Sequence, residues 1–191
     1  MLFNFKCDTC DHMTERTFVE SQHFGVKLKI HGHLSHDMKP GGDKTRWFVY
    51  MVEDNPCGKQ YVGSSINVPS RWSAHKHSAN FPEGKDPLNK KTPTTGLAKH
   101  FQKGCPYDRG PTKHTLSLTL LDYYDVSSDS LSRAGHKPGA ACRCKECNAL
   151  KDIEDKWILK VGSCFGKSGL NERCEVVNKT RFDWKKQRII P

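Results

Sequence analysis

The chain has 191 residues, a formal net charge of +10 at pH 7 and a sequence pI of about 9.2, which together suit one moderate domain with a small appendage and a polyanionic partner. Nucleic acid is the first expected partner and an acidic membrane surface the second. No apolar run approaches the roughly 20 residues of a membrane span, and the start MLFNFKCDTC lacks the pattern of a signal peptide, so we expect a nuclear or cytoplasmic protein without membrane insertion or secretion.

The first 45 residues are rich in cysteine and histidine and end in the loop-forming sequence KPGGDK. Cys7 and Cys10 form a C-x2-C pair, and His31 and His36 follow after a gap longer than that of a typical Cys2His2 finger. Zinc held by nitrogen and sulfur ligands suits a segment too short for a core of its own. We therefore expect a zinc-finger-like module over residues 1–45, with these four side chains as ligands.

A hairpin is expected next. RWFVYMV (46–52) is dense in β-branched and aromatic residues, EDNPCGK supplies turn residues, and QYVG (60–63) resumes the extended pattern. Pairing that is symmetric about the turn places Tyr50 opposite Tyr61, with both rings on one face of the sheet.

Two helices are expected after the hairpin. Asn67 is a suitable N-cap for a helix over residues 68–79, which places Arg71 and His75 on one helix face at positions i and i+4. TGLAKHFQKG (95–104) indicates a shorter helix that Gly104 ends.

The next elements are a strand at HTLSLTLLDYY (114–124) and a helix at CNALKDIEDKWILKVG (147–162). Glu154 lies at the edge of the apolar stripe of this helix. A carboxylate there loses solvation, at a cost in free energy unless a cation or a hydrogen-bond donor meets it. The plainer alternative is a glutamate that points outward or pairs with Lys151.

Three segments together carry a family resemblance: FVYMVEDNPCGKQYVGSSINVPSRW, DIEDKWI and GKSGLNER. In order and spacing they resemble the GIY-YIG nuclease family, over residues 47–171. The matching positions are Phe48-Val49-Tyr50 for GIY, Tyr61-Val62-Gly63 for YIG, Arg71 eight residues after that glycine, Glu154 in E-x2-W-I, and Gly169-Leu170-Asn171. The first element departs from the family pattern because it reads FVY, although its tyrosine is kept.

The resemblance implies an α+β fold, with a three-stranded antiparallel sheet flanked by helices over residues 46–175. It also implies magnesium-dependent (or manganese-dependent) hydrolysis of DNA phosphodiester bonds. Glu154 would hold the metal ion, Arg71 would bind the phosphate, and Tyr50 or Tyr61 would deprotonate or orient the attacking water. The remaining implied site residues are His75 as phosphate orienter or proton relay, Asn171 as structural support, and Ser64 and Lys76 as DNA contacts.

A cysteine-rich insertion is expected near residues 127–148. Cys142, Cys144 and Cys147 form C-x-C-x2-C, and with His136 they are candidate ligands of a second zinc ion. The other cysteines, Cys57, Cys105, Cys164 and Cys174, are interpreted as isolated thiols. Residues 176–191 are basic and are expected to form a tail or a final helix.

A zinc finger joined to a GIY-YIG domain resembles the endonucleases of eukaryotic mobile elements, Penelope-like retroelements among them. Such an enzyme would act on DNA, and it is a candidate to bind DNA as a homodimer. The alternatives are a DNA-binding protein on the same fold with little or no activity, and a secreted domain held by disulfides. The missing signal pattern and the nine cysteines, an odd number, argue against the secreted class.

Overall fold

The structure is a computed structural model that describes residues 17–30, 42, 44–80, 96–102, 116–127, 145–164, 169–171, 181–183 and 188–190. Most of the expected zinc ligands lie outside them: Cys7, Cys10, His31, His36, His136, Cys142 and Cys144. Both expected zinc sites therefore stay predictions.

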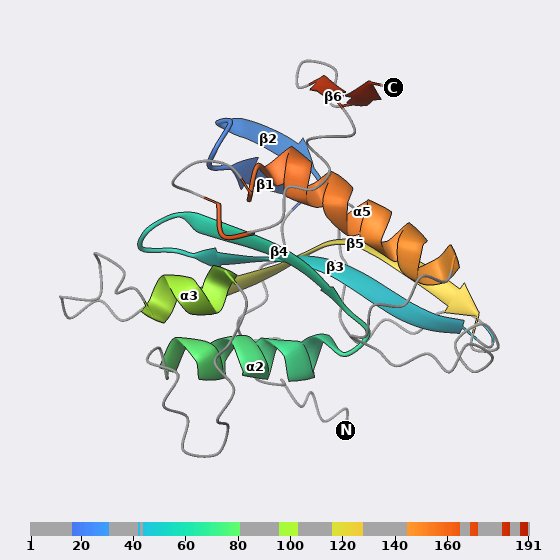
Figure 1. The fold of residues 1–191 in the computed structure, drawn as a ribbon, viewed down its shortest axis with the longest axis horizontal. Coiled ribbons are helices and arrows are strands. Elements are labelled where there is room, and N and C mark those ends of the chain that lie inside the picture. The colour runs from blue at the N-terminus through green and yellow to red at the C-terminus, as the bar shows by residue number, and fades with distance from the viewer. Residues whose placement is uncertain are drawn as a thin grey trace, which may run out of the picture.

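The centre of the fold is a three-stranded antiparallel sheet with the strand order β4-β3-β5 (Figure 1). Its strands are β3 (Lys44–Asp54), β4 (Lys59–Ser65) and β5 (Leu116–Ser127). Residues 47–52 of the central strand are all buried, because helices or a hairpin cover both faces of the sheet. The predicted antiparallel sheet is confirmed.

The register of the hairpin differs from the prediction. Tyr50 pairs with Gly63, and Tyr61 pairs with Val52, so the expected pairing of Tyr50 with Tyr61 was wrong by two residues. The reason is a turn over residues 55–58, centred further along the chain than symmetric pairing assumed. Side chains alternate between faces with a period of two, so an even shift leaves both tyrosines on one face, as predicted.

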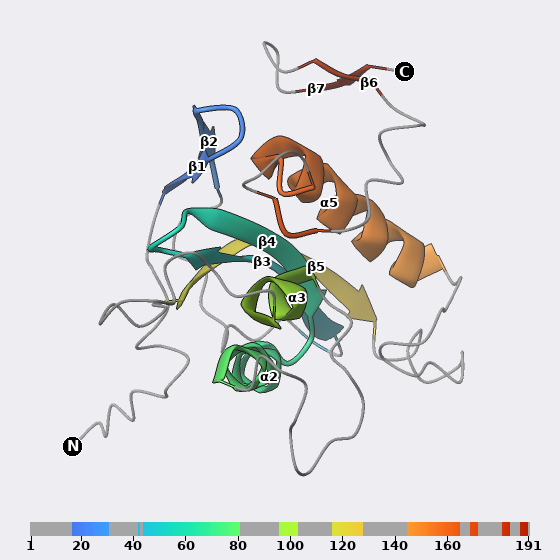
Figure 2. The ribbon, with the colours of Figure 1, turned by 60° about the vertical axis from the view of Figure 1, so that its left-hand side comes forward.

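The two faces of the sheet carry different elements (Figure 2). One face packs against α2 (Val68–Asn80) and α3 (Gly96–Gln102), and its core includes Tyr50, Tyr61, Trp72 and Leu97. The other face packs against α5 (Lys145–Val161). The apolar stripe of α5 supplies Leu150, Trp157, Ile158 and Val161 to the second core. The helix predicted from this stripe is therefore present, beginning two residues earlier than expected.

A short hairpin that the sequence analysis did not predict completes the second core. It consists of β1 (Phe18–Ser21) and β2 (Val26–Lys29), and its buried side chains Val19, Leu28 and Ile30 pack in the same cluster as α5 and the sheet. The Gln60 side chain on β4 bonds to the Glu20 carbonyl oxygen (2.7 Å) and the Gln22 backbone N–H (3.1 Å). These described residues of segment 1–45 thus share a core with the sheet, while the boundary expected at residue 45 stays a prediction.

The remaining strands are β6 (Arg181–Asp183) and β7 (Arg188–Ile190), which pair as a small hairpin within the expected basic tail. Cys164 is disulfide-bonded, so its interpretation as an isolated thiol was wrong, whereas Cys57 and Cys147 form no disulfide. Within the described part of the chain, no helix has the length and apolar character needed to cross a membrane.

Candidate active site

Helix α2 begins where the sequence predicts it and brings a cation and an imidazole against the two tyrosines. The Asn67 side-chain oxygen accepts a hydrogen bond from the Ser70 N–H (3.0 Å), and the Asn67 carbonyl accepts from the Arg71 N–H (3.1 Å). This cap sets the start of the helix. Arg71 and His75, one turn apart, consequently face the same side of the sheet as Tyr50.

The Tyr50 hydroxyl is the meeting point of these side chains. Arg71 Nε donates to the Tyr50 oxygen at 3.3 Å, and His75 Nε2 lies 3.0 Å from the same oxygen. The Tyr61 ring packs edge-on against His75, with 5.4 Å between ring centroids. Tyr50 and Tyr61 are 1% and 9% exposed, so the cluster is almost fully withdrawn from water.

The direction of the Tyr50 hydrogen bonds follows from the chemistry of the partners. A guanidinium only donates, so the Tyr50 oxygen accepts from Arg71 and its own hydrogen is directed to His75 Nε2. That arrangement requires a neutral imidazole. Burial, reinforced by the positive charge of Arg71, lowers the pKa of His75 to about 3, so the ring is neutral near pH 7 and its hydrogen lies on Nδ1.

Both phenols are protonated in this state. Burial raises the pKa of Tyr50, the neighbouring Tyr61 adds to the rise, and the Arg71 charge and hydrogen bond only partly oppose it. Burial also raises the pKa of Tyr61, again against the influence of Arg71. Neither tyrosine is therefore a ready base by itself at neutral pH, and the Tyr50 hydroxyl already donates its hydrogen to His75.

Gly63 leaves room for the rings of Tyr50 and Tyr61, which lie against the backbone of β4 at this residue. A Cβ at this position would be 2.8 Å from the Tyr50 hydroxyl oxygen and 2.9 Å from Cε1 of Tyr61. Real Cβ atoms essentially never approach other heavy atoms so closely, so any side chain here would displace the tyrosines. The glycine of the Tyr-Val-Gly segment is thus explained by the ring positions.

Glu154 reaches the same region from the opposite face of the sheet. Ser64 follows Gly63 on β4, and its hydroxyl donates to Oε2 of Glu154 at 2.5 Å. Burial raises the pKa of Glu154, while the Ser64 hydrogen bond and the Arg71 charge act in the opposite direction. The Glu154 charge in turn raises the pKa values of Tyr50 and Tyr61. These couplings show that the carboxylate, the guanidinium and the phenols share one electrostatic environment.

The site therefore lies around an edge strand. Because β4 is at one side of the sheet, side chains from its two faces can meet around it at Gly63 and Ser64. Asn171 lies beside this point and bonds to both backbone groups of Val62, at 2.8 Å to the N–H and 2.7 Å to the carbonyl. These two bonds cover part of the edge of β4.

The predicted site residues are thus brought together to different degrees. Tyr50, Tyr61, Arg71 and His75 form one contact cluster, and Glu154 joins it through Ser64 and through charge. Ser64, expected to contact DNA, bonds to Glu154. Lys76 is half-exposed and follows His75 on α2.

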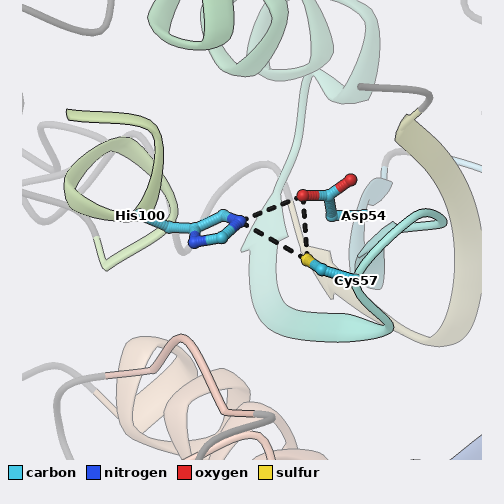
Figure 3. A group of neighbouring side chains, drawn as sticks. All are labelled: Asp54, Cys57 and His100. Carbon is cyan, nitrogen blue, oxygen red and sulfur yellow. Dashed lines mark hydrogen bonds and ion pairs between the residues drawn. The ribbon is translucent and has the colours of Figure 1, made fainter. Parts of the chain in front are cut away.

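One cluster escaped the sequence analysis: Asp54, Cys57 and His100 lie together where β3 runs into the turn (Figure 3). Asp54 and Cys57 are three residues apart in that turn, the spacing of a metal-binding C-x2-C pair, and this was the available signal. His100 is 43 residues further along the chain than Cys57. Nothing in the spacing of the sequence connects it to the turn.

The fold and the site together define a class of protein. It is a small α+β domain in which two phenols, a guanidinium and a carboxylate lie around the edge strand of the sheet. The family model described as the GIY-YIG catalytic domain matches residues 46–103 of this chain. The match contains Tyr50, Tyr61, Arg71 and His75. Comparisons with curated proteins and with solved structures gave no match.

Proposed function

We propose that the chain is a DNA endonuclease that hydrolyses phosphodiester bonds with the help of Mg²⁺ (or Mn²⁺). The observation that carries the proposal is the half-buried carboxylate of Glu154, which is bonded to Ser64 at the edge strand β4 and interacts through charge with Arg71 and the two tyrosines. DNA is a polyanion, and a buried carboxylate beside it is repulsive unless a cation lies between them. Binding alone gives no reason for such a carboxylate.

The donor atoms around Glu154 fit a magnesium ion. Mg²⁺ prefers oxygen ligands, keeps several of its waters and is bound through one or two carboxylates together with phosphate oxygens of the substrate. The Glu154 carboxylate and the Ser64 hydroxyl are oxygen donors, and the raised pKa of Glu154 reflects a negative charge that burial leaves under-compensated. When bound, the metal would offset negative charge on the scissile phosphate and the leaving oxygen.

In this proposal, Arg71 binds the phosphate. Its Nε bond to the Tyr50 hydroxyl orients the plane of the guanidinium, which is half-buried at the surface of α2. A guanidinium held in this way offers paired N–H groups that match two phosphate oxygens, a geometry that an ammonium group does not reproduce.

We assign to Tyr50, rather than to Tyr61, the orientation of the attacking water. The Tyr50 oxygen is the atom that Arg71 and His75 hold from two sides, so its position is the better defined. His75 keeps the phenol hydrogen directed away from Arg71. Ser64 orients the Glu154 carboxylate, and Lys76 on the same helix as Arg71 is assigned to the DNA backbone.

The zinc module at residues 1–45, with Cys7 and Cys10 among its ligands, and the second zinc site near Cys142 remain part of the proposal. An origin in a mobile element, a nuclear location and action as a homodimer on DNA belong to it as well. The net charge of +10 supports binding of the chain to the DNA backbone.

A plasmid assay tests the proposal. Purified protein with supercoiled plasmid and Mg²⁺ is expected to produce nicked or linear DNA, and a chelator is expected to stop the reaction. Gel electrophoresis over a time course measures the rate, and a mobility-shift assay in the chelator measures binding separately. Binding without any cleavage in Mg²⁺ or Mn²⁺ would instead identify a DNA-binding protein that has lost the activity.

A further inference from the structure

A second group of reactive side chains lies at the turn end of the β3–β4 hairpin. Asp54 ends β3, Cys57 lies in the turn that follows, and His100 reaches them from α3 (Figure 3). The distances are 3.0 Å from Asp54 Oδ2 to His100 Nε2, 3.0 Å from Cys57 Sγ to Asp54 Oδ2, and 3.5 Å from Cys57 Sγ to His100 Nε2. In the described part of the chain, no other group of three histidine, cysteine or acidic side chains converges in this way.

The backbone of the turn holds the first two side chains in place. The Asp54 carbonyl accepts hydrogen bonds from the N–H groups of Cys57 (3.2 Å) and Gly58 (2.7 Å), and Gly58 adopts a positive φ of 64°. This closed turn directs Asp54 and Cys57 to the same point. Asp54 is 0% exposed and His100 is 6% exposed, so the carboxylate is removed from water and requires compensation of its charge.

The three ligand atoms lie close enough to one another to share a single metal ion. His100 Nε2 faces both Asp54 Oδ2 and Cys57 Sγ, yet an imidazole nitrogen offers either one hydrogen or one lone pair. A metal ion between the three atoms would take one lone pair from each. Tetrahedral zinc, with bonds of about 2.0 Å to nitrogen and oxygen and about 2.3 Å to sulfur, separates such ligands by about 3.3–3.6 Å. The distance from Cys57 to His100 agrees with these values, and the two distances to Asp54 Oδ2 are shorter by about 0.3–0.5 Å.

We propose that Asp54, Cys57 and His100 bind a zinc ion that joins α3 to the β3–β4 turn. A thiolate, an imidazole and a carboxylate form a ligand set typical of zinc, whereas Mg²⁺ and Ca²⁺ prefer oxygen ligands alone. The three side chains supply three of the four positions that zinc takes. This site differs in every residue from the zinc sites expected near Cys7 and near Cys142.

Lys59 opposes zinc binding at this site. Its Nζ lies 3.3 Å from Nδ1 of His100 and, as an ammonium group, can only donate a hydrogen bond to that nitrogen. When zinc occupies Nε2, the Nδ1 atom carries a hydrogen and normally donates it to an acceptor. The ammonium hydrogens of Lys59 then face the hydrogen on His100 Nδ1, and the positive charge of Lys59 lies near the metal ion. Both effects weaken zinc binding. Lys59→Gln provides an acceptor instead, so we expect this variant to bind zinc more tightly.

The test is the alkylation of Cys57, because total zinc content would also report other cysteine clusters. The full chain is treated with iodoacetamide in added zinc or in a zinc chelator, and the modified Cys57 peptide is quantified by mass spectrometry. We expect zinc to slow alkylation of Cys57 by about tenfold or more, since the bound thiolate is no longer an available nucleophile. The control Lys29→Gln, at an exposed lysine on β2, is expected to leave this protection unchanged.

Two variants decide the proposal. Changes next to a zinc ligand typically cost 10–100-fold in affinity, so His100→Gln, which removes a ligand, is expected to raise the zinc concentration for half-protection by at least about 100-fold. Lys59→Gln is expected to lower that concentration. If Cys57 reacts equally fast in zinc and in chelator, or if Lys59→Gln abolishes the protection, the three residues form a hydrogen-bonded cluster and the proposal is overturned. Lys59 is half-exposed, so its variant keeps the test valid even where His100→Gln fails to fold.

Discussion

Glu154→Gln is expected to abolish magnesium-dependent DNA cleavage while leaving DNA binding intact or tighter. Glutamine has nearly the same size and can still bond to the Ser64 hydroxyl, but it lacks the charge that holds the cation. Removing one preorganised electrostatic contact typically lowers kcat by 10²–10³-fold, so we expect a loss of at least about 10³-fold for the carboxylate proposed to hold the catalytic ion. The plasmid time course measures the first effect and a mobility shift in chelator the second.

The matched control is Asp152→Asn, which removes an exposed carboxylate from the same helix and is expected to cleave at close to the wild-type rate.

The stability of the folded protein gives an independent check of the Glu154 variant. Because burial raises the pKa of Glu154, its protonation favours the folded state at low pH and this contribution is lost as the pH rises. In chelator near pH 7 the glutamine variant should thus be at least as stable as the wild type. Equal cleavage by wild type and Glu154→Gln would remove this carboxylate from the mechanism.

Arg71→Lys is expected to lower the cleavage rate by about 10²-fold or more at saturating DNA, because stabilisation of developing phosphate charge is lost. Lysine keeps the positive charge but cannot offer paired N–H groups to two oxygens. It also lacks the Nε–H that orients the side chain on the Tyr50 hydroxyl. Single-turnover rates with a saturating short duplex separate this effect from weaker binding.

The control for this variant is Arg46→Lys. Like Arg71, Arg46 is an arginine whose guanidinium is oriented by hydrogen bonds to another side chain. Arg46 forms a paired hydrogen bond with Asp125, at 2.6 Å and 2.7 Å, and contacts none of the proposed site residues in the described contacts. We expect its single-turnover rate to stay within a few-fold of the wild type. A change of only a few-fold in Arg71→Lys would reject the proposed role of Arg71 at the phosphate.

Much of the fold could be predicted because its elements carry strong local patterns. The continuous apolar run of β3 and the helical stripe of α5 require no knowledge of the tertiary structure. The N-cap at Asn67 likewise placed Arg71 and His75 on one helix face, and the structure shows both at the Tyr50 hydroxyl. The register prediction failed because the length of a turn is set by backbone conformation, here the positive φ of Gly58, which a sequence indicates only weakly.

The elements that were missed depend on contacts between distant segments. The strands of the β1–β2 hairpin have four residues each, too short for a clear periodicity, and they are stabilised by Gln60 on β4 and by the α5 terminus. Ser64 was expected to contact DNA, and only the packing of α5 against β4 reveals its bond to Glu154. The meeting of His100 with Asp54 and Cys57 is likewise a product of the tertiary structure.

The most direct measurement of the central claim is Mn²⁺ binding in the presence of uncleaved DNA, read from the electron paramagnetic resonance signal of free Mn²⁺. The wild type and Asp152→Asn are expected to bind one more ion per chain than Glu154→Gln. If Glu154→Gln takes up as much Mn²⁺ as the wild type, the catalytic ion is not held by Glu154, and the proposed arrangement of the site is contradicted.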